Sequence, residues 1–286
     1  MEEPEDRLDE DAVAAEAQAL GAEERWDEAR SMLLEALEDA PDSALLLCWA
    51  GIACQRLGED GQAYEHFRQS LARSPVDPFV LATAGSGVAA FDDPDAEPAL
   101  RAAAVMSPDL AYARAAYGAY LAREGLFAQA IEELGAARML APDDPDAALD
   151  LAIARLQAGE REAGIAGLED VLSLRPDDSW TRGVLGLAQA AAGRGEEAAE
   201  ILHEVSMERP EDVELLLAAA LAAAAEGWDD EAHRALAAAE AAAEPMDADL
   251  LESTQEAVDG GAEEADALLR DELAPAVLRE RLSQRA

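Results

Sequence analysis

Hydrophobic residues follow a helical spacing that restarts about every 34 residues along the chain. In residues 44–77 one apolar stripe has members three or four residues apart and ends before Gly58: Leu47, Ala50, Gly51, Cys54 and Leu57. A second stripe with the same spacing follows: Ala63, Phe67, Ser70 and Leu71. Such spacing places side chains on one face of a helix. The pattern predicts two antiparallel helices of about a dozen residues, joined by a short turn.

Prolines mark each restart of the pattern. They recur at intervals of 33 to 35 residues: Pro41, Pro75, Pro108, Pro142, Pro176, Pro210 and Pro245. Two positions after most of them stands a short polar residue: Ser43, Asp77, Asp144, Asp178, Asp212 and Asp247. A side-chain oxygen there accepts hydrogen bonds from the free amides of the next helix, while the proline stops the previous one. Each interval is therefore predicted to begin a helix at the same phase.

Small residues recur where the two helices of a pair would touch. On the first helix they are Gly51, Gly85, Gly118, Ala152, Gly186 and Ala220. On the second helix they are Ala29, Ala63, Ala96, Ala130, Gly164, Ala198 and Ala232. A small side chain lets the paired backbones approach closely. Because one hairpin cannot bury its apolar faces alone, the hairpins are predicted to stack on one another.

This pattern is similar to that of the tetratricopeptide-repeat (TPR) family, most fully in residues 44–77. The resemblance implies an all-α, right-handed superhelical solenoid of about seven helix-turn-helix repeats. The expected segments are an acidic tail at 1–9, repeats at 10–43, 44–77, 78–110, 111–144, 145–178, 179–212 and 213–245, and C-terminal helices at 246–286. The third repeat departs from the pattern: it is one residue short and has Phe91-Asp92-Asp93-Pro94 in place of the usual glycine turn.

The resemblance also implies a concave groove, lined by the first helices, that holds a segment of a partner protein. Family geometry assigns these apolar residues to it: Leu45, Ile52, Phe79, Tyr112, Leu149, Ile153, Leu156, Trp180, Leu187, Leu217 and Leu221. Asp146 and Glu214 add negative charge there. An exposed apolar surface of this size would mark an interaction site. The alternative is that a neighbouring repeat or the chain's own C-terminus covers these residues.

Charge narrows the choice of partner. The chain carries 63 Asp and Glu against 21 basic residues, a net charge of −42, and it contains no Lys or Asn. Direct nucleic-acid binding and anionic membranes are disfavoured, since both require a basic surface. The groove also lacks the Lys and Asn that grip a terminal carboxylate in some TPR proteins. A partner with an apolar face and basic flanks fits better. Halophilic adaptation or compositional bias would also explain the acidity.

No motif in the sequence predicts catalysis, a cofactor or a metal. The chain has no glycine-rich phosphate loop, no Gly-x-Ser-x-Gly and no Cys-x-x-Cys. Glu200 and His203 have a ligand-like spacing on a helix, but a di-metal site would need a second copy. Cys48 and Cys54 lie six residues apart on one helix, too far for a disulfide. With an acidic start and no long apolar segment, the sequence predicts a cytoplasmic, soluble, non-enzymatic protein.

The C-terminal segment differs in charge from the rest. Arg279, Arg281 and Arg285 make the last predicted helix basic, and it also carries an apolar stripe. It is predicted either to cap the seventh repeat or to occupy an acidic groove, its own or that of a second copy in a homodimer. The function predicted from the sequence is a scaffold or adaptor for a partner protein. A client-binding chaperone and a regulatory subunit of an enzyme complex remain alternatives.

Overall fold

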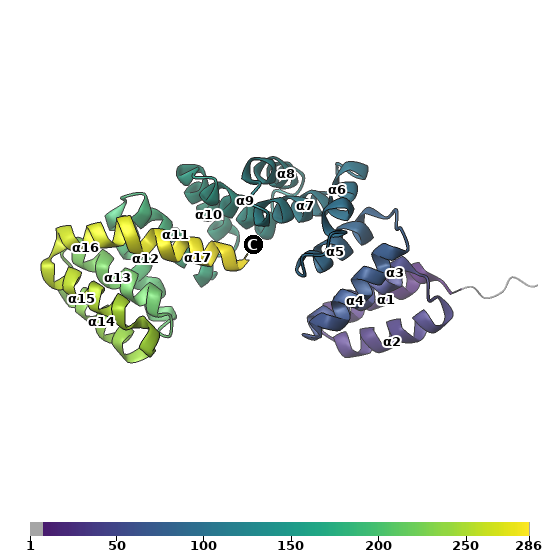
Figure 1. The fold of residues 1–286 in the computed structure, drawn as a ribbon, viewed down its shortest axis with the longest axis horizontal. Coiled ribbons are helices and arrows are strands. Elements are labelled where there is room, and N and C mark those ends of the chain that lie inside the picture. Colours follow the sequence, from purple (N-terminus) through teal and green to yellow (C-terminus); the bar gives the residue numbers. More distant parts are fainter. Residues whose placement is uncertain (1–7, 286) are drawn as a thin grey trace, which may run out of the picture. The chain divides into compact units, whose positions relative to one another are not determined.

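The computed structural model describes residues 8–285, and the side chains of residues 8–282. Every regular element in this part of the chain is a helix (Figure 1). The all-α prediction is therefore confirmed. Most of the predicted acidic tail, and the side chain of Arg285, lie outside what the structure describes. The chain divides into two compact units, Met1–Ala141 and Pro142–Ala286.

The first unit is built of four helical hairpins. Its helices are α1 (Glu10–Ala22), α2 (Trp26–Asp39), α3 (Ala44–Arg56), α4 (Asp60–Ala72), α5 (Pro78–Ala89), α6 (Ala96–Met106), α7 (Ala111–Arg123) and α8 (Phe127–Leu140). Each odd-numbered helix pairs with the even-numbered helix that follows it, and α1, α3 and α5 also contact the next hairpin. The core of this unit consequently lies between successive hairpins.

The second unit has three hairpins and a C-terminal segment. Its hairpin helices are α9 (Pro145–Gln157), α10 (Arg161–Leu174), α11 (Ser179–Ala191), α12 (Gly195–Glu208), α13 (Val213–Ala225) and α14 (Asp229–Ala242). The C-terminal segment comprises η1 (Pro245–Asp247), α15 (Ala248–Gly260), α16 (Ala262–Leu268), η2 (Leu269–Leu273) and α17 (Ala274–Arg285).

The small residues lie at the helix contacts where the sequence predicts them. A Cβ atom built on Gly51 of α3 would lie 2.6 Å from the ring of Phe67 on α4. In the second unit, a Cβ atom on Gly186 of α11 would lie 2.9 Å from Leu202 on α12. Since carbon atoms do not pack this closely, the large partner fills the space that the glycine leaves.

Most of the helices that come first in their hairpins begin with a polar capping residue. Ser43, Asp77, Asp144, Asp178 and Asp212 each accept a hydrogen bond from a backbone amide in the first turn that follows. Asp247 does not cap α15 with its side chain, so this prediction is wrong. Its carboxylate instead accepts from the backbone amide of Glu244, because a 3₁₀ turn stands between α14 and α15.

The turn of the third hairpin forms without glycine. Gly58, Gly125, Gly159, Gly193 and Gly227 take positive φ between the helices of their hairpins. Asp92 replaces them between α5 and α6, with φ of 54°. Aspartate tolerates this left-handed conformation better than most residues. The hairpin therefore keeps its geometry at some cost in backbone strain.

The C-terminal segment folds back over the first helices of the second unit. In Figure 1 the yellow helix runs along the hairpins, and the contacts place α16 on α13 and α17 on α11 and α9. A π-helical turn, η2, joins α16 to α17 just before Pro275. Proline lacks an amide hydrogen and its ring collides with the carbonyl four residues earlier, so a wider turn accommodates it.

Candidate protein-binding faces

Three aromatic side chains line up across the first helices of the first unit. The ring centroids of Trp49 on α3 and Phe79 on α5 lie 5.8 Å apart. Those of Phe79 and Tyr112 on α7 lie 6.0 Å apart. We call Trp49, Phe79 and Tyr112 the aromatic row. Leu45 and Ile52 of α3 are half-buried, and like Phe79 they pack against one hydrophobic cluster. The structure thus brings together the four groove residues predicted for this unit.

Trp49 is a member of this face that the sequence reasoning missed. It lies four residues after Leu45, one helical turn along α3. The family pattern does not use that position, but helical spacing alone would have placed Trp49 and Leu45 on one side.

Tyr112 is the most exposed member of the aromatic row, with 44% of its surface accessible. Its hydroxyl lies 3.1 Å from the hydroxyl oxygen of Thr83 on α5, and burial of this end raises the pKa of Tyr112. The ring is therefore anchored at its polar tip. Aromatic rings held in this way offer apolar contact area at small entropic cost, as in many protein interfaces.

In the second unit, five predicted groove residues are buried. Leu149 and Ile153 of α9, Leu187 of α11, and Leu217 and Leu221 of α13 are at most 4% exposed. We call these five residues the covered face. The expectation that they face solvent is wrong, because their helices lie beneath the C-terminal segment. Leu156 and Trp180 are half-buried.

The apolar side chains of the C-terminal segment pack into the covered face. Leu187, Leu217 and Leu221 share one hydrophobic cluster with Leu269, Leu273 and Val277. Leu149 and Ile153 share another with Leu282. Of the two alternatives raised by the sequence, coverage by the chain's own C-terminus therefore describes this unit.

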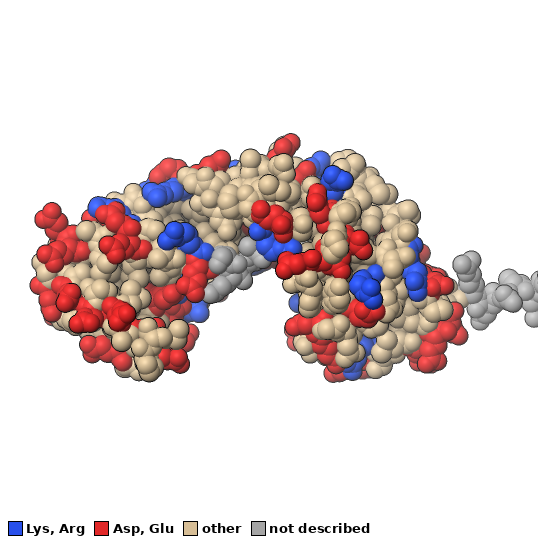
Figure 2. All heavy atoms as spheres, viewed as in Figure 1, with Lys and Arg blue, Asp and Glu red and all other residues tan. Residues whose placement is uncertain are grey.

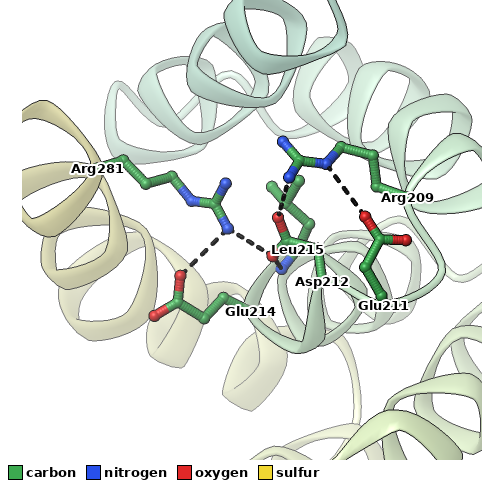
Figure 3. A network of polar contacts seen from close by, with 6 residues as sticks. All are labelled: Arg209, Glu211, Asp212, Glu214, Leu215 and Arg281. Atoms are coloured by element: carbon green, nitrogen blue, oxygen red, sulfur yellow. Dashed lines mark hydrogen bonds and ion pairs between the residues drawn. The ribbon is translucent and has the colours of Figure 1, made fainter. Parts of the chain in front are cut away.

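The two predicted acidic residues of the groove have different surroundings. Asp146 is exposed and forms an ion pair with Arg175, at 2.8 Å. Glu214 accepts a hydrogen bond from Arg281 of α17, at 3.2 Å. The same guanidinium nitrogen donates to Asp212, the cap of α13, so it bridges two carboxylates (Figure 3). Arg209 lies on the other side of Asp212, at 3.6 Å.

Burial opposes ionisation of Glu214. Desolvation raises the pKa of its carboxyl group, and the nearby Glu280 and Asp212 raise it further, whereas Arg281 lowers it. Arg281 itself is only 9% exposed, and its Nε atom is buried without a hydrogen-bond partner. This polar contact is therefore imperfectly satisfied, which reduces its net contribution to stability.

Within residues 8–282 no group of three or more His, Cys, Asp and Glu side chains could hold a metal ion. Cys48 and Cys54 are free and buried, and burial raises the pKa of the Cys48 thiol to about 12. Such a thiol is unreactive near neutral pH. None of the helices in this part of the chain is long and apolar enough to span a membrane.

Comparison with known proteins agrees with the hairpin architecture. A sequence profile described as a tetratricopeptide repeat matches residues 121–184, from the end of α7 into α11. No curated protein sequence matches the chain.

Several solved structures are similar in fold. A chain of the Cut9–Hcn1 hetero-tetramer of the APC/C has a TM-score of 0.68 and 18% identity, over 87% of this chain and 50% of that one. The type IV pilus biogenesis factor PilW has a TM-score of 0.60 and 19% identity, over 70% of this chain and 94% of that one. Pseudomonas aeruginosa pilF has a TM-score of 0.58 and 20% identity, over 70% and 92%. With its repeated hairpins, the profile match over residues 121–184 and these structural similarities, the chain has the fold of a tetratricopeptide-repeat protein.

Proposed function

We propose that the protein is a non-catalytic scaffold or adaptor that holds a segment of a partner protein against the aromatic row. The tetratricopeptide-repeat fold is in general a protein-interaction module, and the aromatic row is the observation that carries the finer assignment. Its three rings lie on consecutive first helices and all remain partly accessible. Large aromatic residues at a surface commonly dominate the binding energy of protein interfaces.

The negative charge of the molecule indicates which residues would flank the apolar residues of such a partner. Figure 2 shows acidic side chains spread over the visible surfaces of both units, with fewer basic ones between them. At a net charge of −42, attraction favours a partner with Arg or Lys beside its apolar residues. We therefore propose a helix or peptide with apolar anchors and basic flanks. Two buried free cysteines suit a reducing compartment, and we assign the scaffold to the cytoplasm.

A pair of matched substitutions tests the site. Tyr112→Glu puts a charge into the aromatic row, whereas Met139→Glu puts the same charge on α8, at a residue that is 85% exposed. Tagged wild-type and variant chains would capture partners from a native extract, with identification by mass spectrometry. A photo-crosslinking residue at position 112 would then show which segment of the partner lies there.

The expected result is one or two stoichiometric partners, lost at least tenfold on Tyr112→Glu and retained on Met139→Glu. Circular dichroism checks that both variants are folded. Equal capture by both variants would contradict the proposal. Capture of many unfolded proteins would favour the client-binding chaperone instead, and a co-purifying enzymatic activity would favour the regulatory subunit.

A further inference from the structure

The last helix of the second unit covers a surface that does not need an end cap. A solenoid exposes apolar residues at its final repeat, and capping helices cover them. Here α15 contacts α14 and α13, and α16 contacts α13, so these two helices already cover the final hairpin. In contrast, α17 lies on α11 and α9, which belong to earlier hairpins. It therefore lies on the helices that were expected to hold a segment of a partner protein.

The contact made by α17 has the pattern of an amphipathic helix in a groove. Val277 and Leu282 are buried, Leu278 is partly buried, and all three join the clusters of the covered face. Arg281 lies on the same side and pairs with Asp212 and Glu214 (Figure 3). Apolar anchors at helical spacing, with one basic side chain that reaches an acidic edge, are the elements of helix-in-groove recognition.

Two features limit how tightly α17 is held. The ion pairs of Arg281 are imperfectly satisfied, because its Nε lacks a hydrogen-bond partner and burial raises the pKa of Glu214. In addition, Pro275 and the π-helical turn interrupt the regular hydrogen bonding between α16 and α17. This turn is the point at which α17 would separate from α16.

We propose that the part of the covered face on α9 and α11, formed by Leu149, Ile153 and Leu187, is a second docking groove for an amphipathic helix of a partner protein, and that α17 is its intramolecular competitor. The partner helix would repeat the chemistry of Val277, Leu278, Arg281 and Leu282: apolar residues one turn apart, with an arginine facing Asp212 and Glu214. This inference is independent of the aromatic row, which lies in the other unit. Binding at the covered face would require release of α17.

Charge reversal in the full-length chain tests the competition. Arg281→Glu would place a third carboxylate beside Asp212 and Glu214 and release α17. Arg279→Glu makes the same change on the exposed side of the same helix, and serves as the matched control. The probe is a fluorescent peptide of residues 270–286, and its binding is measured by anisotropy. Amide hydrogen exchange over residues 274–282 reports whether α17 has been released.

The Arg281→Glu chain should bind the peptide at least tenfold more tightly than the wild-type or Arg279→Glu chains do. It should also lose protection over residues 274–282, and a peptide that carries Arg281→Glu should bind at least tenfold more weakly. Equal binding to all three chains, or unchanged protection in Arg281→Glu, would overturn the proposal. A wild-type dimer that Arg281→Glu dissociates would also overturn it, because the occupant would then be a second copy.

If Arg281→Glu does not fold, Leu282→Ala replaces it, since it removes apolar contact without adding charge. The same tenfold gain in peptide binding is expected. Its absence in a folded Leu282→Ala chain that has lost protection over residues 274–282 would likewise overturn the proposal. Neither variant alters the aromatic row, so partner capture through Tyr112 should persist and keeps the two proposals separable.

Discussion

Arg281, near the end of α17, donates a hydrogen bond to Asp212, the cap of α13 that lies 69 residues earlier in the chain. The same carboxylate oxygen of Asp212 accepts the backbone amide of Leu215, at 3.2 Å. One acidic side chain therefore both begins a helix of the last hairpin and anchors the C-terminal segment. Loss of Arg281 should consequently affect more than a surface ion pair.

We expect Arg281→Ala to lower the free energy of unfolding by about 1–3 kcal/mol, because Asp212 and Glu214 would remain close together without a shared donor. Arg279→Ala, on the exposed side of α17, should change it by no more than about 0.5 kcal/mol. Urea denaturation followed by circular dichroism measures both. Equal effects would show that the contact of Arg281 contributes little.

The glycines of the helix contacts should be intolerant of a methyl group. Gly51→Ala would put a Cβ atom 2.6 Å from the ring of Phe67, and we expect a loss of about 1–3 kcal/mol from overpacking. Gly135 of α8 has no other atom within 4 Å of its Cβ position. Gly135→Ala should therefore stabilise the chain by about 0.5–1 kcal/mol through helix propensity. Thermal unfolding would show opposite shifts for the two variants.

The turn between α5 and α6 offers a stabilising change. Since Asp92 has φ of 54°, Asp92→Gly should relieve strain and raise the free energy of unfolding by about 0.5–1 kcal/mol. The neighbouring Asp93 instead accepts hydrogen bonds from Tyr64, at 2.8 Å, and from the amide of Asp95. Asp93→Gly should therefore destabilise by about 1 kcal/mol. If both variants destabilise, strain at Asp92 is not the controlling factor.

Stability should decrease as His66 becomes protonated. Burial lowers the pKa of His66 in the folded chain, with Glu65 opposing this, and its Nδ1 atom is buried without a partner. Between this lowered pKa and the ordinary value near 6.5, the unfolded state binds more protons than the folded state does. The contribution of neutral His66 is thus complete above about pH 6.5 and declines as the pH falls.

Melting temperatures at pH 7.5 and 5.5 test this dependence on His66. The wild type should lose more on acidification than His66→Gln does. His233→Gln, at an exposed position of α14, should behave like the wild type. Equal losses in all three chains would assign the effect to other groups.

Partner binding should depend on salt. If basic flanks of the partner meet the acidic surface, the association rate should fall by about tenfold or more from low to high ionic strength, because the Debye length shortens. Stopped-flow mixing with the captured partner measures it. A constant rate across the titration would argue for purely apolar recognition.

Much of the fold follows from local signals. The spacing of Pro75 and Pro142 with their caps Asp77 and Asp144 predicts where helices begin, because capping is decided within a few residues. Gly51 and Phe67 likewise predict a close helix contact. The wrong cap at Asp247 arose where a 3₁₀ turn, which the repeat does not contain, changed the local backbone.

Exposure of the groove was less predictable. Ile153 and Leu187 occupy the same place in their repeats as Ile52, which stays partly accessible, and they pack against a segment more than fifty residues away. No local pattern encodes such a contact. The one available signal was charge, since Arg279 and Arg281 stand out in an acidic chain.

During translation the covered face is synthesised before the helix that covers it. Leu187 is made 90 residues before Val277, which packs in the same hydrophobic cluster. At about 5–20 residues per second, translation would leave this apolar surface without its cover for roughly 5–18 s. Throughout this interval the nascent chain would present an apolar surface to the cell, and molecular chaperones that bind such surfaces could engage it before α17 arrives.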